Sequence, residues 1–148
     1  MTGKSAFTEE EWHTVAQGPP VAGFLVITAQ HGGSFRESFA LAKAYAEARQ
    51  QHGESELLDE IVSAKPEVDR HRYGSPEKLQ EEGPKDLSNA VAVLQSKASP
   101  EEVEDYRTFV LALARRVAAA HKEEGQSVSP AEQEVIDRIA ESLGAQAP

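Results

Sequence analysis

Two helix-start signals near the C-terminus constrain this chain most. Residues 99–102 (SPEE) and 129–132 (SPAE) each place a serine at the N-cap, a proline in the first turn and a glutamate at the capping-box position. After each signal, apolar residues recur every three or four positions, as they do on a helix with one buried face. Gly144 follows the second stripe, and glycine readily adopts the left-handed conformation that ends helices. The pattern predicts a helical hairpin, with arms at 99–121 and 129–143.

The same reasoning predicts helices earlier in the chain. A capping box at 8–11 starts a helix that should end at Gly18-Pro19-Pro20, because proline is not tolerated inside a helix. A second segment should then run from Pro19 or Pro20 to about residue 30. It is apolar nearly all round, which indicates a central buried helix, and a buried β-strand is the alternative. Further helices are predicted at 34–51, 55–65 and 86–96.

The predicted helix 34–51 has a distinctive composition. Its expected contact face alternates phenylalanine with alanine, at Phe35, Phe39, Ala42 and Ala46, and such a face lets a neighbouring helix approach closely. Residues 65–84, in contrast, mix proline and glycine with charged residues. We expect them to form a surface connection with one or two short helical turns.

No stretch alternates apolar and polar residues over a strand length, so the predicted fold class is all-α. We expect a compact bundle of about six to seven helices in one domain spanning residues 1–148, with residues 1–7 frayed. Residues 24–47 and 109–143 share an order of features: an apolar helix, a histidine, glycine, a serine cap and an amphipathic helix. Two related helical hairpins are therefore a second way to group the bundle.

Composition excludes several classes of function. The chain has 15 basic and 25 acidic residues in 148, a formal net charge of -10, and no run of lysine or arginine, which argues against nucleic acid as a partner. A negative field suits cations or a basic protein surface, although acidic residues also simply keep a protein soluble. The absence of cysteine excludes disulfides and thiolate zinc sites. No segment resembles a signal peptide or a membrane span, so we expect a cytoplasmic protein without membrane insertion.

One family resemblance rests on the C-terminal hairpin. Residues 118–125 (AAAHKEEG), 128–132 (VSPAE) and 136–144 are similar to the motif of the tellurite-resistance TerB-like helical proteins, with a degraded copy at 31–37. The resemblance implies an all-helical fold, an association with stress responses and a proposed capacity for metal binding. The chain departs from the family where an aspartate usually precedes the glycine, since His31 and Glu124 stand there instead.

A metal site is the sharper of two interpretations of the hairpin ends. His31 and His121 occupy corresponding positions, and two packed hairpins would bring them near a set of carboxylates. That set would hold a divalent transition ion through His31, His121, Glu37 and Glu132, with Glu123 and Glu124 nearby. The simpler interpretation is that each histidine interacts with the free carbonyls of a helix C-terminus, and we favour it.

No catalytic motif is present. Residues 69–73 (DRHRY) could bind an anion or hold His71 as a general base, but a solvated charged loop explains them better. Trp12 is predicted to anchor the core or to plug a small interface. We therefore expect no enzyme activity and no cofactor other than a divalent metal. The favoured function is a TerB-like helical interaction or scaffold protein with a protein partner or self-association, and the alternative is a metal-binding or metal-responsive protein.

Overall fold

The computed structural model describes residues 6–28, 42–47, 56–62, 76–123 and 130–144, and all regular secondary structure in these ranges is helical. A short helical segment at 42–47 accompanies five longer helices: α1 (Glu9–Thr28), α3 (Glu56–Val62), α5 (Pro76–Lys97), α6 (Pro100–Glu123) and α7 (Pro130–Leu143). The predicted all-α class is confirmed. The grouping into two related hairpins stays a prediction, because residues 29–41 lie outside the described part.

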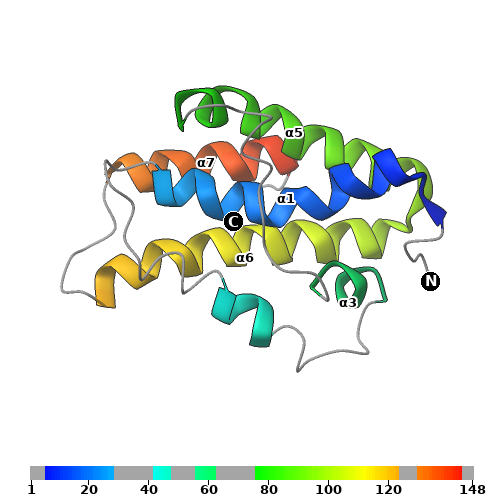
Figure 1. Cartoon of the computed structure of the whole chain (residues 1–148), viewed down its shortest axis with the longest axis horizontal. Helices are drawn as coiled ribbons and strands as arrows, with labels where there is room; N and C mark the ends of the chain where they lie inside the picture. The colour runs from blue at the N-terminus through cyan, green and yellow to red at the C-terminus, as the bar shows by residue number, and fades with distance from the viewer. Residues whose placement is uncertain (1–5, 29–41, 48–55, 63–75, 124–129, 145–148) are drawn as a thin grey trace.

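The four long helices form a bundle (Figure 1). α1 and α6 run in one direction, and α5 and α7 run in the opposite direction. α1 packs mainly against α5 and α6, and α7 packs mainly against the same two helices. α3 packs on α6, and the segment 42–47 joins it there through a contact between the rings of Tyr45 and Phe109. The described helices share one hydrophobic core, whereas the assignment of residues 1–148 to a single domain stays a prediction.

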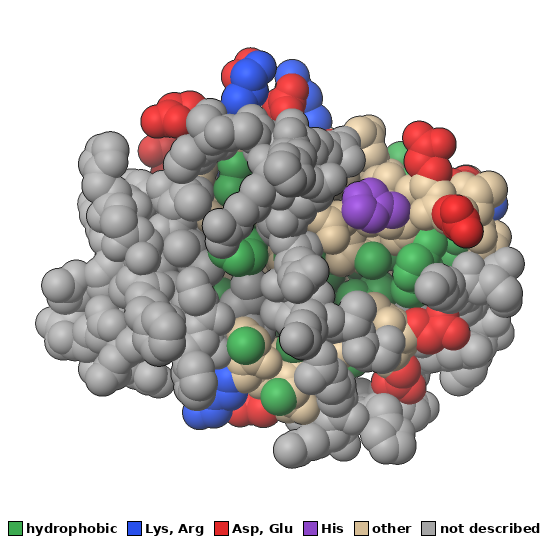
Figure 2. Space-filling model, viewed as in Figure 1, with side chains coloured by type: hydrophobic (Ala, Val, Ile, Leu, Met, Phe, Trp, Pro, Cys, Tyr) green, Lys and Arg blue, Asp and Glu red, His purple; other side chains and the backbone are tan. Residues whose placement is uncertain are grey.

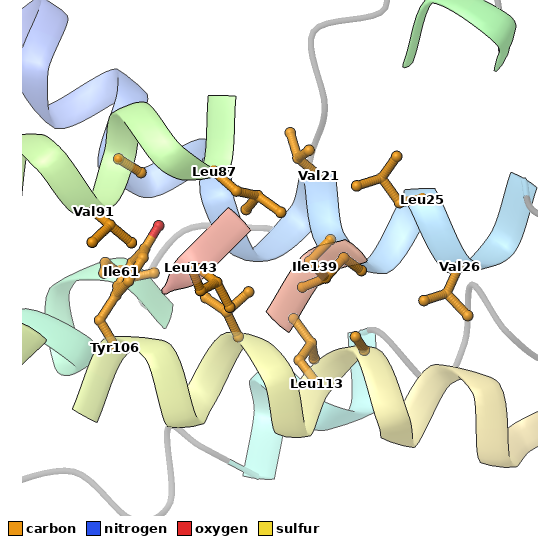
Figure 3. Packing of buried hydrophobic residues seen from close by; sticks show 14 of the residues in the cluster. Val21, Leu25, Val26, Ile61, Leu87, Val91, Tyr106, Leu113, Ile139 and Leu143 are labelled. Carbon is orange, nitrogen blue, oxygen red and sulfur yellow. The ribbon is translucent and has the colours of Figure 1, made fainter. Parts of the chain in front are cut away.

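The apolar stripes predicted for the long helices form this core. Figure 3 shows side chains of α1, α5, α6 and α7 meeting between the helices, with Leu25, Leu87, Leu113 and Ile139 among them. Each of these is at most 2% exposed. Full burial of such a side chain stabilises the folded state by about 1.5–3 kcal/mol. The complete predicted stripe of α6 is buried: Val103, Tyr106, Val110, Leu113 and Val117.

Two of the predicted capping boxes are present with both of their reciprocal hydrogen bonds. At the start of α1, the amide of Thr8 donates to Glu11 Oε1 over 2.9 Å, and the amide of Glu11 donates to Thr8 Oγ1 over 3.1 Å. Ser99 and Glu102 make the same pair of bonds before α6, both at 3.2 Å. Gly144 has a φ of 73° directly after α7, as predicted for its role in ending that helix. The capping box at 34–37 lies outside the described residues, and so do Ser129 and the side chains of residues 130–132 in the box before α7.

The predicted break at Gly18-Pro19-Pro20 is wrong, because α1 continues through both prolines. A proline inside a helix removes one backbone hydrogen bond and costs about 3 kcal/mol or more. Two features offset this cost. The helix after the prolines is buried on nearly all sides, as predicted, and the carbonyl that Pro19 leaves without its helical donor receives another one.

That other donor is Tyr106 of α6. In a helix the amide of residue 19 would donate to the carbonyl of Val15, and proline has no amide hydrogen. The Tyr106 hydroxyl donates to the Val15 carbonyl over 2.7 Å instead, in a fully buried position. Gly18 makes the approach feasible, because a β-carbon there would lie 1.9 Å from the hydroxyl oxygen. Burial, with a smaller effect of the neighbouring Tyr45, raises the pKa of Tyr106 well above its ordinary value, so the hydroxyl keeps its proton.

The predicted surface connection at 65–84 is wrong for its second part. α5 begins at Pro76 and includes residues 76–84, so the predicted helix 86–96 is only its second half. Pro76 fits the first turn of a helix, and Pro84 follows Gly83, which is buried beneath Leu25 of α1. Leu79 is 6% exposed and joins the core. Residues 65–75 lie outside the described part of the chain.

Two smaller predictions are also wrong. In the segment 42–47, Ala42 and Ala46 are exposed, while Ala44 and Tyr45 are buried. The helix turns its tyrosine towards α6, because burying a large ring gains more than burying a methyl group. The N-terminus is not frayed as far as residue 7. Phe7 is 9% exposed, and its ring packs 5.8 Å from that of Trp12, measured between centroids.

The contact between Gly18 and Tyr106 predicts that two substitutions are coupled. Gly18→Ala should lower the free energy of unfolding by about 1–3 kcal/mol through overpacking. Tyr106→Phe should lower it by about 1–3 kcal/mol, because the buried Val15 carbonyl loses its donor. The double variant should lose clearly less than the sum, since both changes break one contact and the phenylalanine leaves room for the new methyl group. Urea unfolding of the four proteins measures this, and additive losses would contradict the assignment.

The orientation of the segment 42–47 predicts a contrast between two alanines that stand two residues apart. Ala44→Leu should destabilise the fold by about 1–3 kcal/mol, because Ala44 is buried and a larger side chain would overpack its surroundings. Ala42→Leu is the matched control, since Ala42 is exposed, and it should leave the free energy of unfolding within about 0.5 kcal/mol of the parent's. Equal losses in the two variants would show that both faces of this segment are packed.

Candidate functional site

α1 and α6 begin side by side at one end of the bundle (Figure 1). The bond between Tyr106 and the Val15 carbonyl sets this alignment. Val15 stands six residues after Glu9, where α1 begins, and Tyr106 stands six residues after Pro100, where α6 begins. Because the two helices run in the same direction, their first turns are level with one another.

The first two turns of these helices are rich in carboxylates. We call this region the acidic end, and its residues are Glu9, Glu10, Glu11, Glu101, Glu102, Glu104 and Asp105. All are exposed except Glu11 and Glu102, which are half-buried in the capping boxes. Figure 2 shows several acidic side chains at this end of one face of the molecule. The acidic end therefore presents carboxylates from two adjacent helices to the solvent.

Two described cations lie among these carboxylates, and both have partners. Lys97, the last residue of α5, forms an ion pair with Glu11. Arg107 donates from Nη1 to Glu104 over 3.2 Å and from Nε to the Leu143 carbonyl over 2.6 Å, which ties the end of α7 to α6. The remaining exposed carboxylates form no salt bridge with a described lysine or arginine: Glu9, Glu10, Glu101 and Asp105.

Lys97 shows how this end holds a cation. Its ammonium group contacts the Glu11 carboxylate and lies 5.9 Å from the centroid of the Phe7 ring. An ammonium ion gains from both contacts, through a charge-assisted hydrogen bond and through the negative face of the ring. Trp12 packs beside Phe7 and is half-buried against the core, which agrees with its predicted role as an anchor. The predicted role of Trp12 as an interface plug stays a prediction.

The ionisation of Glu11 follows from these contacts. The hydrogen bond from Lys97, and then the bond from the Thr8 amide, lower the pKa of Glu11 below its ordinary value of 4.5, although desolvation opposes them. The carboxylate is therefore charged at neutral pH. The acidic end can bind cationic groups through charge-assisted hydrogen bonds, and it repels phosphate.

The residues predicted to bind a metal are described only in part. His31 and Glu37 lie outside the described residues. His121 belongs to the last turn of α6 and Glu132 to the first turn of α7, but their side chains are outside the described part. The end of α6 and the start of α7 lie at the same end of the bundle as the end of α1, opposite the acidic end (Figure 1).

The metal site stays a prediction. Among the side chains that the structure describes, no group of three or more histidine, aspartate or glutamate residues is placed to hold an ion. Residues 69–73, with His71, fall outside the described ranges.

The sequence predicts the carboxylates of the acidic end but not that they lie at the same end of the bundle. Glu11 and Glu102 were predicted as members of two separate capping boxes. The signal that joins them is the bond between Tyr106 and Val15, which are 91 residues apart. No local pattern reveals a contact at that separation.

Comparisons with models of protein families, with curated proteins and with solved structures find no match to this chain. The resemblance to the TerB-like proteins therefore stays a prediction.

A separate finding concerns membranes. None of the helices within the described residues combines the length and the apolar character needed to cross a bilayer.

The ion pair of Glu11 predicts a specific dependence of stability on pH. Its lowered pKa means that the pair stabilises the fold above about pH 4.5 and that this contribution is lost as the pH falls through the folded-state pKa. Glu11→Gln keeps a residue that suits the capping box but removes the charge. At pH 7 the parent should unfold at a higher urea concentration than this variant, and the difference should shrink as the pH falls below 4.5 through the folded-state pKa of Glu11. A difference that stays constant over the whole acid range would show that packing or capping causes it.

Proposed function

We propose that this protein is a non-catalytic helical interaction protein whose acidic end binds a basic segment of a partner protein. The observation that carries the proposal is the pair of level, parallel helix starts, which places seven carboxylates at one end of the bundle. Four of them form no salt bridge with a described lysine or arginine, so they are available to lysine and arginine side chains of a partner.

The roles of the carboxylates inside the fold do not account for all of them. Glu11 and Glu102 complete the capping boxes, and Glu104 pairs with Arg107. The other four interact favourably with the helix dipoles, an effect of about 0.3–1 kcal/mol each that does not need so many charges in one place. An association with stress responses follows from the TerB-like resemblance alone and belongs to this proposal as an expectation.

The proposal predicts that binding of a basic peptide depends on where the charges stand. With a dodecalysine peptide as the probe, the variant E9Q/E10Q/E101Q/D105N should bind about tenfold more weakly than the parent in low-salt titration calorimetry, because four contacts are removed. The matched control is E77Q/E81Q/E134Q/D137N, which removes four exposed charges from α5 and α7, outside the acidic end. It should bind nearly as tightly as the parent.

Two outcomes would contradict this proposal. Equal loss in the two variants would mean that the peptide responds only to the net charge of the chain. Parent-like binding by the first variant would place the contact elsewhere. Analytical ultracentrifugation of the parent tests self-association, and a stable dimer that buries the acidic end would replace the basic partner with a second copy of the chain.

A divalent-metal protein is the second candidate function, favoured by the meeting of three helix ends. The backbone of His121 at the end of α6 and that of Glu132 at the start of α7 lie at one end of the bundle. α1 also ends there, three residues before His31 in the sequence. Imidazole together with carboxylate suits a divalent transition ion. The proposal concerns His31, His121, Glu37 and Glu132.

Calorimetric titration of the full chain with Zn²⁺ tests this candidate. We expect one saturable site that His121→Ala weakens at least tenfold, because a ligand is lost. His13→Ala is the control, since His13 is exposed near the start of α1 at the other end of the bundle, and it should not change the affinity. Absence of saturable binding, or equal effects of the two substitutions, would contradict the metal site without bearing on the binding of basic peptides.

A further inference from the structure

We draw no further inference here: the strongest candidate, the uncharged stripe of small side chains at Ser88, Ala92 and Ser96 along the exposed face of α5, carries nothing because nothing in the structure shows what covers it.

Discussion

The hydrogen bond from the Tyr106 hydroxyl to the Val15 carbonyl is the contact on which the rest of the bundle depends. It does two things at once. It gives a buried carbonyl the donor that Pro19 cannot supply, and so makes a continuous α1 possible. It also sets the register between α1 and α6, because a hydroxyl can reach this carbonyl only where Gly18 leaves space for the ring. A proline that would break an isolated helix thus becomes a specific docking point for another helix.

A close approach to a glycine that precedes a proline occurs a second time, with a different partner. Gly83-Pro84 in α5 repeats the glycine and proline order of α1, and a β-carbon at Gly83 would lie 3.0–3.2 Å from side-chain atoms of Leu25. Next to this contact, Gln80 donates from its side chain to the Leu25 carbonyl over 2.8 Å. In both helices the glycine allows a large side chain of a neighbour to approach the backbone. In the first contact Gly18 of α1 receives Tyr106 of α6, and in the second Leu25 of α1 approaches Gly83 of α5. α1 therefore packs closely against both helices.

Features that depend on residues close together in the sequence could be predicted, and those that depend on distant residues could not. The capping boxes at Thr8 and Ser99 join residues three apart, and the stripe of α6 reflects one helical period, so local patterns contain both. The path through Pro19 depends on Tyr106, a partner far along the chain, and local rules predict a break there. The buried face predicted for the segment 42–47 was wrong for another reason. Helical period gives the spacing of a face, but only packing decides that Tyr45 rather than Ala42 turns inward.

The acidic end depends on both kinds of interaction. Local sequence patterns predict its carboxylates at helix starts, but only the tertiary packing of α1 and α6 brings the two starts to the same end of the bundle. Parallel packing of α1 and α6 brings two helix N-termini together, and each carries a partial positive charge, so their approach is unfavourable by itself. First-turn glutamates such as Glu9 and Glu101 offset that repulsion, whereas an antiparallel pair would need no such compensation. Their presence thus has a structural reason that precedes any partner. Carboxylates gathered at one end also repel one another. In the proposed function a basic segment would relieve this repulsion on binding, and the stability of the helix pair would then depend on the occupancy of its acidic end.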